Sequence, residues 1–122
     1  SIISATIWWP EMERQVRIEG VATLMDRGLA EEYHSSRPRK SRIAAWASDQ
    51  SRPLPSREEL KQRYEKYELK FGDGEIPLPP FWGGYTIRAD KVEYWEGRPN
   101  RMHDRVVLTR TDDGWDTERL YP

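Results

Sequence analysis

The chain has 122 residues, a length that suits one domain, and 20 Lys and Arg against 21 Asp and Glu give it a formal net charge of −1. This balance argues against a nucleic-acid-binding protein, which is normally distinctly basic, and the absence of cysteine excludes disulfides and thiolate metal sites. Aliphatic residues are scarce, but six Trp and six Tyr bury large areas, so we expect a folded domain with a thin, aromatic-rich core. With only two histidines, no metal site is predicted.

The chain opens with a strand-like segment, residues 2–9, which is rich in β-branched and aromatic residues. Because proteins seldom begin within a strand, we interpret the chain as a fragment whose upstream part is missing. The segment lacks the basic start of a secretory signal, and no apolar run reaches the ~18 residues of a membrane span. We therefore expect a cytoplasmic protein that does not enter a membrane.

A second strand is predicted over residues 14–24, where apolar and polar residues alternate. It should pair with the first strand in antiparallel fashion. Gly20 within it indicates a bulge or a close approach of another backbone segment.

A helical insert follows the two strands. Asp26 can cap a short helix that ends near Ser36, and a second short helix is predicted over residues 41–48. The clearest helix covers residues 56–71, because Ser56 and Glu59 have the spacing of a capping box. Its apolar residues recur on one face: Leu60, Tyr64, Tyr67 and Phe71.

The last third of the sequence predicts a β-meander. Strands are expected over residues 85–88, 92–95, 101–109 and 115–120, separated by turn-forming residues. The predicted fold is therefore mainly β, with about six strands and a helical insert between the second and third.

A cluster of cations surrounds Ser41: Arg37, Arg39, Lys40 and Arg42. Arginine is suited to bidentate phosphate binding, and serine adds a hydroxyl donor. The cluster therefore predicts an anion-binding pocket, or alternatively a solvated basic turn.

The alternation of a strand would place Arg101, His103 and Arg105 on one face. Two arginines beside a histidine would repel one another without an anion, and histidine titrates near neutral pH. The segment predicts an anion site with a proton-handling group, or alternatively a charged face paired with carboxylates.

We expect His34, near a helix end, to cap the helix or to be exposed, and Trp82 to pack in a corner.

Motifs along almost the whole chain resemble the C-terminal part of the pyridoxine (pyridoxamine) 5′-phosphate oxidase family. They occur in the family's order: Arg14 to Gly20, Tyr33 with Ser36 to Ser41, Ala45 to Ser51, Pro77 to Tyr85, Glu93 to Arg98, Arg101 to Arg105, and Arg119 to Pro122. The resemblance implies a split β-barrel that binds FMN at the interface of a homodimer, with residues from about 80 to 122 forming the dimerisation region. It also implies oxidation of pyridoxine or pyridoxamine 5′-phosphate to pyridoxal 5′-phosphate, with O₂ as acceptor.

The resemblance also implies roles for individual residues. Tyr33, Arg37 and Ser41 match residues that hold the substrate phosphate, and Arg101 and His103 match the pair over the substrate ring. The residues that match FMN contacts are Gln15, Gln50, Ser51, Trp95 and Arg105. Two alternatives stay open: a relative in the same flavin fold with another substrate, and a truncated, non-catalytic homologue that binds pyridoxal phosphate or only dimerises.

Overall fold

The computed structural model describes residues 1–122 and contains two compact units. One unit, residues 1–23 and 85–122, is a β-sheet, and the other, residues 24–84, is helical. The mainly β fold with a helical insert is as predicted, whereas the single-domain organisation stays a prediction. None of the helices is long and apolar enough to cross a membrane.

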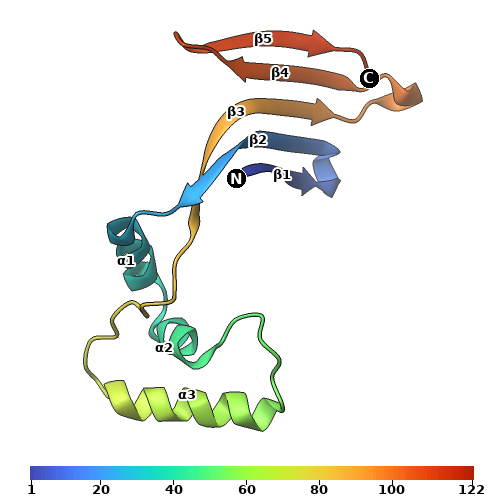
Figure 1. The fold of residues 1–122 in the computed structure, drawn as a ribbon. Coiled ribbons are helices and arrows are strands. Elements are labelled where there is room, and N and C mark those ends of the chain that lie inside the picture. The colour runs from blue at the N-terminus through green and yellow to red at the C-terminus, as the bar shows by residue number, and fades with distance from the viewer. The chain divides into compact units, whose positions relative to one another are not determined.

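Five strands form one sheet in the order β1-β2-β3-β4-β5 (Figure 1). Their bounds are Ile2–Trp9, Arg14–Leu24, Tyr85–Glu96, Asp104–Arg110 and Trp115–Leu120. The predicted antiparallel pairing of the first two strands is confirmed, with Ile2 opposite Val21 and Trp9 opposite Arg14. β3, β4 and β5 form the predicted antiparallel meander.

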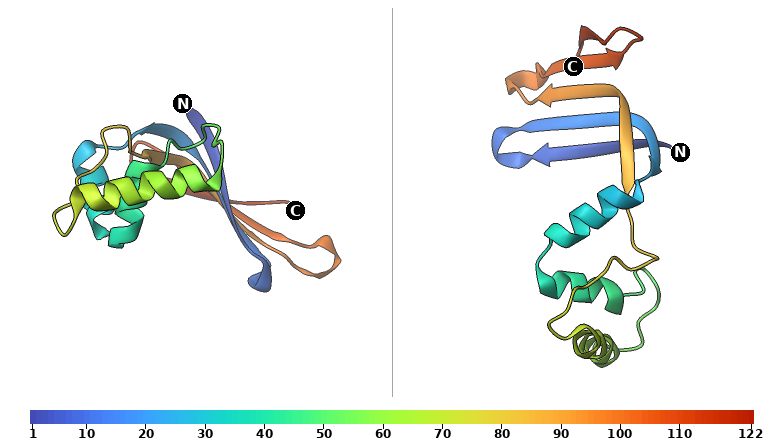
Figure 2. Two further views of the ribbon diagram at one scale, coloured as in Figure 1. Left: turned by 90° about the horizontal axis from the view of Figure 1, so that it is seen from below. Right: turned by 90° about the vertical axis from the view of Figure 1, so that its left-hand side faces the viewer.

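β3 is one long strand where the sequence predicted two, so the sheet has five strands and not six. The residues at Ala89 and Asp90 form no turn, and the strand bends strongly instead (Figure 2). Only Lys91–Glu96 pairs with β4. The bend brings the Arg88 carbonyl against Gly20 of β2, where an added Cβ would lie 2.1 Å from the oxygen. The close approach expected at Gly20 is therefore confirmed.

The strand register gives the sheet two chemically different faces. Trp8 lies opposite Gln15 and Trp95 opposite Arg105, and the rings of Trp8 and Trp95 are 5.8 Å apart, so these four side chains share one face. We call this the Trp95 face. The opposite face is mainly apolar and includes Ile3, Ala5, Ile7, Trp9, Val16, Ile18, Val92, Tyr94, Val106 and Leu108.

The helical unit contains α1 (Arg27–Ser36), α2 (Arg39–Ala47) and α3 (Arg57–Phe71). Asp26 accepts hydrogen bonds from the Gly28 and Leu29 amides, as its predicted capping role requires. Ser56 accepts one from the Glu59 amide, which is half of the predicted capping box. α2 begins two residues earlier than predicted, because the Pro38 carbonyl accepts the Ser41 and Arg42 amides and so starts the helix.

Aromatic packing joins α2 to α3. Trp46 lies 5.7 Å from Tyr67 and 5.4 Å from Phe71, measured between ring centroids, and its indole donates to the Pro77 carbonyl. Arg39 at the start of α2 donates to the carbonyls of Gly72 and Gly74, just beyond α3. These contacts fix the start of α2, which carries candidate site residues.

Candidate functional site

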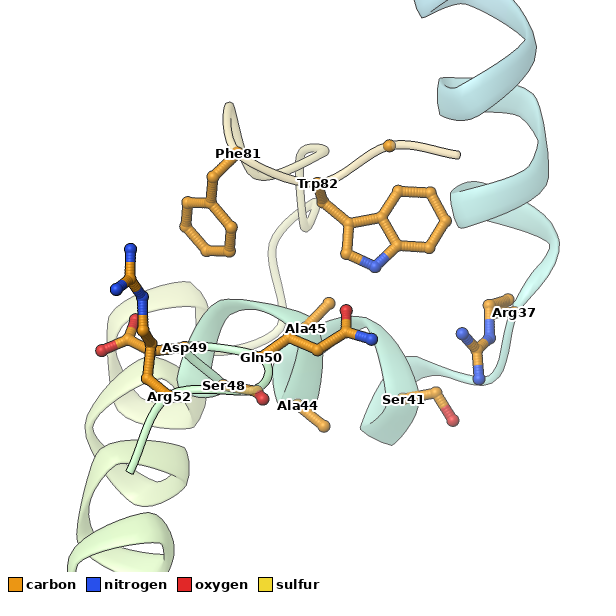
Figure 3. A pocket seen from close by; sticks show the side chains of 11 residues that line it. Arg37, Ser41, Ala44, Ala45, Ser48, Asp49, Gln50, Arg52, Phe81 and Trp82 are labelled. Carbon is orange, nitrogen blue, oxygen red and sulfur yellow. The ribbon is translucent and has the colours of Figure 1, made fainter. Parts of the chain in front are cut away.

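A cavity of about 620 Å³ lies within the helical unit and contains three of the predicted site residues (Figure 3). Arg37 and Ser41 lie at one end and Asp49 and Arg52 at the other, with Phe81 and Trp82 across from α2. The remaining lining residues are Ala44, Ala45, Ser48, Gln50 and Gly83. The cavity thus combines a cationic end, aromatic rings and a floor of small side chains.

The junction between α1 and α2 positions Arg37 and Ser41. The Arg37 amide donates to the His34 carbonyl at 3.2 Å, which ends α1, and Ser41 lies in the first turn of α2. Arg37 forms no ion pair with any carboxylate of the chain. Its positive charge is therefore available to an anion, beside a helix N-terminus that also favours negative charge.

Tyr33, the third predicted phosphate-binding residue, lies next to this end of the cavity. Its ring stacks on Trp82 with centroids 6.1 Å apart, and the Arg37 guanidinium carbon is 5.9 Å from its centroid. Tyr33 is about half exposed and lies outside the cavity lining. Tyr33 thus contacts two residues that line the cavity, Arg37 and Trp82. Trp82 is in the packed corner that was predicted, and it also faces the cavity.

Gln50 and Ser51 are neighbours in the loop after α2, but they line different cavities. The Gln50 side chain extends into the cavity (Figure 3), whereas Ser51, with a left-handed φ of 65°, lines a neighbouring cavity of about 280 Å³. Arg63 of α3 holds this loop through a bidentate pair with Asp49, at 2.7 and 2.9 Å. The same hydrogen bonds keep the pKa of Asp49 below its ordinary value. No local sequence signal identifies Arg63, because its partner is 14 residues away.

His34 is buried, and the expectation that it caps the helix or is exposed is wrong. It follows Ala30 by one helical turn, and this face of α1 is packed inside the unit. Its ring meets Trp82 edge-on at 5.7 Å, and its Nε2 has no hydrogen-bond partner. Burial first, and then the charge of Arg42, lowers the pKa of His34, so the neutral ring is favoured.

On the sheet unit, three residues expected to contact FMN share the Trp95 face: Gln15, Trp95 and Arg105. Gln15 and Trp95 also border a cavity of about 320 Å³ whose other lining residues lie mostly on the apolar face. The register of β1 to β4 brings these three residues together although they are distant in sequence.

Glu93, which the sequence did not single out, holds Arg105 on that face. Arg105 donates to both Glu93 carboxylate oxygens, at 3.1 and 2.9 Å, and to the Tyr121 carbonyl at 3.0 Å. These hydrogen bonds lower the pKa of Glu93 and raise that of Arg105. Since a guanidinium has five N–H groups, two remain for a ligand.

The prediction that Arg101, His103 and Arg105 line one strand face is wrong. β4 begins at Asp104, and Arg101 ends a 3₁₀ turn, Pro99–Arg101, in which Asn100 and Arg101 both have a left-handed φ of 60°. This turn reverses the chain, so the alternation of a strand does not extend back to Arg101. Arg101 is exposed, and it is the only arginine of the sheet unit without an ion pair.

His103 lies between the turn and β4, against Trp95. The two ring centroids are 4.8 Å apart with planes tilted by 39°. The backbone amide of Arg98 donates to His103 Nδ1 at 3.0 Å. The Trp95 ring therefore lies between the rings of Trp8 and His103.

Comparisons with known proteins agree with the motifs. The family model described as pyridoxamine 5′-phosphate oxidase matches residues 2–71, and the pyridoxine 5′-phosphate oxidase C-terminal dimerisation region matches residues 82–122. A pyridoxine/pyridoxamine 5′-phosphate oxidase of Rubrobacter xylanophilus is 45% identical over 98% of this chain and 55% of its own length. One from Caulobacter vibrioides is 48% identical over 93% of this chain and 51% of its own length. The chain thus spans about half the length of the curated relatives that it matches.

Solved structures show the same fold. PhzG from Burkholderia lata 383, in complex with tetrahydrophenazine-1-carboxylic acid, matches 98% of this chain and 58% of its own with a TM-score of 0.87 at 26% identity. A pyridoxamine 5′-phosphate oxidase-related, FMN-binding protein from Nostoc punctiforme matches 96% of this chain and 61% of its own with a TM-score of 0.63 at 16% identity, which is evidence for the fold alone. The predicted fold class, a split β-barrel with a helical insert, is confirmed. With a family model matching more than half of its residues, the chain belongs to the pyridoxamine 5′-phosphate oxidase family.

Proposed function

We propose that this chain is part of an FMN-dependent oxidase that converts pyridoxine 5′-phosphate or pyridoxamine 5′-phosphate to pyridoxal 5′-phosphate, with O₂ as electron acceptor. The observation that carries the proposal is the cavity with unpaired Arg37 and Ser41 at one end and aromatic side chains along its wall. This combination suits a flat aromatic ring that bears a phosphate. The curated relatives named above support the same substrate class.

The helical unit would hold the phosphate. Arg37 offers a charged fork and Ser41 offers a hydroxyl, and both lie beside the N-terminus of α2. The one acidic residue that lines the cavity, Asp49, is neutralised by Arg63. The cationic end is thus free of competing carboxylates from the cavity wall.

The sheet unit offers groups that fit FMN. Gln15 provides an amide, Trp95 a ring, and Arg105 two free N–H groups, all on one face. When bound, FMN supplies the two-electron redox chemistry, which no side chain of this chain can perform. Gln50 and Ser51 would add polar contacts, and we propose that two copies of the protein form a homodimer with FMN at their interface. The match to the family's dimerisation region supports this assembly.

Arg101 and His103 would orient the substrate ring. Arg101 is exposed and unpaired, so its charge can meet an anionic or oxygen-bearing ligand. His103 is held in place by Trp95 and by the Arg98 amide. A fixed ring can position a substrate group at little entropic cost.

The test is steady-state kinetics of the full-length protein that contains this chain, loaded with FMN. Arg37→Ala should raise the KM for pyridoxamine 5′-phosphate about tenfold to hundredfold, because a lost charge-assisted hydrogen bond costs about 1.5–3 kcal/mol. Lys40→Ala is the matched control, since Lys40 is an exposed neighbouring cation outside the cavity lining. Absence of turnover with bound FMN, or equal effects of both variants, would contradict the proposal.

A second candidate is a flavin enzyme of the same fold that acts on a tricyclic compound. The likeness to PhzG, which was solved with tetrahydrophenazine-1-carboxylic acid, favours it. Comparing kcat/KM for pyridoxine 5′-phosphate with that for this tricyclic acid separates the two. A protein that binds neither FMN nor either compound would instead be a non-catalytic homologue.

A further inference from the structure

The ring of His103 is held by a donor that cannot change its role. The Arg98 backbone amide lies 3.0 Å from Nδ1. A backbone N–H only donates, so Nδ1 must present its lone pair. In a neutral imidazole the ring proton must then reside on the other nitrogen, Nε2.

The aromatic contact fixes the plane of the same ring. His103 lies 4.8 Å from Trp95, which is itself backed by Trp8 at 5.8 Å. A half-turn of the imidazole would replace Nδ1 with a carbon opposite the Arg98 amide and lose the hydrogen bond. The observed orientation is therefore the one that satisfies the amide.

The turn between β3 and β4 fixes the position of the amide. The Gly97 amide donates to the Glu13 carbonyl at 2.7 Å, and the Met102 amide donates to the Pro99 carbonyl at 3.2 Å. A Cβ at Gly97 would lie 3.1 Å from both the Glu13 Cβ and the Trp95 ring, so the turn packs closely against both residues. Each end of the turn is thus tied down, and Arg98 and His103 face each other across it.

We propose that neutral His103 is locked as the Nε2–H tautomer and acts toward the bound ligand as a hydrogen-bond donor, not as a proton acceptor. Nε2 already carries the proton and Nδ1 is occupied by Arg98, so neither nitrogen offers the ligand a free lone pair. The group that His103 recognises must then be a hydrogen-bond acceptor. The identity of this ligand rests on the proposed function, whereas the tautomer does not.

The tautomer can be observed directly in the unliganded full chain. Long-range ¹H–¹⁵N correlation of ¹⁵N-labelled histidine, recorded at about pH 8.5, distinguishes the protonated from the unprotonated ring nitrogen of a neutral imidazole. The residues described here contain only two histidines, and a His34→Gln variant assigns the signals. We expect His103 to show an unprotonated Nδ1 and a protonated Nε2; the reverse pattern, or averaging between the two forms, would overturn the proposal.

The donor role is tested by two variants of the FMN-loaded full-length protein. His103→Gln retains an N–H near the position of Nε2 but cannot act as a base, whereas His103→Leu retains neither function. We expect kcat/KM for pyridoxine 5′-phosphate to be about tenfold higher in the Gln variant than in the Leu variant. Equal values in the two variants would overturn the donor role. Inactivity of the unmodified protein would count against the proposed function and would leave the tautomer measurement decisive for the lock.

Discussion

Replacement of Glu93 by Gln should destabilise the sheet unit, because Glu93 is the main anchor of Arg105. The variant keeps the size of the side chain and removes its charge. Of the two hydrogen bonds that Glu93 accepts from Arg105, the amide can retain one through its oxygen. Arg105 keeps its bond to the Tyr121 carbonyl, so the change falls on the ion pair alone.

The magnitude follows from how far the pair is shielded from water. An exposed ion pair contributes roughly 0.2–1 kcal/mol, and breaking a buried one costs roughly 3–5 kcal/mol. The Glu93 side chain is 13% exposed and that of Arg105 31%, which lies between these limits. We therefore expect Glu93→Gln to lower the free energy of unfolding by about 2 kcal/mol, or Tm by roughly 6–10 °C.

Urea unfolding followed by tryptophan fluorescence measures this loss, and Asp104→Asn is the matched control. Asp104 pairs with Arg119 at 2.8 Å, but these side chains are 31% and 72% exposed, so the control should lose less than about 1 kcal/mol. The pKa of Glu93 lies below its ordinary 4.5, so its contribution is present above that pH and is lost as the pH falls through the folded-state value. A Glu93→Gln cost no larger than that of the control, or one that persists on acidification, would refute the reasoning.

Two further predictions concern single positions in each unit. Gly20→Ala should lower the free energy of unfolding in urea by about 3 kcal/mol, because the new Cβ would lie 2.1 Å from the Arg88 carbonyl oxygen. Gly83→Ala is the control and should be nearly neutral, because nothing lies within 4 Å of its Cβ. Similar costs for the two variants would argue against a tight β2–β3 contact. Since the pKa of buried His34 is lowered, the unfolded chain binds the extra proton, and stability should fall as the pH drops below about 6.5, before carboxylates titrate. His34→Gln should flatten the difference in unfolding free energy between pH 7 and pH 5.5; an unchanged difference would show that His34 does not cause it.

Elements with local signals were predicted well from the sequence. Asp26 and Ser56 mark helix starts through their own side chains, and each accepts the amide hydrogen bonds expected of a cap. The first strand follows from its β-branched and aromatic composition, and the second follows from alternation within its own segment. A helix cap or a strand can be predicted from the sequence when the residues that form it lie in one short segment of the chain.

Features that depend on distant partners could not be predicted. The residues at Ala89 and Asp90 have turn chemistry, yet they continue β3 through a bend that depends on Gly20, far away in sequence. The Asp49–Arg63 clamp likewise joins a loop to a helix 14 residues on. Both would be visible only to a method that pairs positions across the chain.

Among the arginines of the sheet unit, only Arg101, in the turn Pro99–Arg101, has no ion pair. The other seven of its eight arginines lie within 4 Å of a carboxylate, so their charges are paired within the fold. On a regular strand Arg101 would also have carboxylate neighbours, because Glu and Asp occur on each of β3, β4 and β5. The left-handed conformation of Asn100 and Arg101 removes it from that pairing. A near-zero net charge is thus compatible with a site for anions, because what matters there is which cation the backbone leaves unpaired.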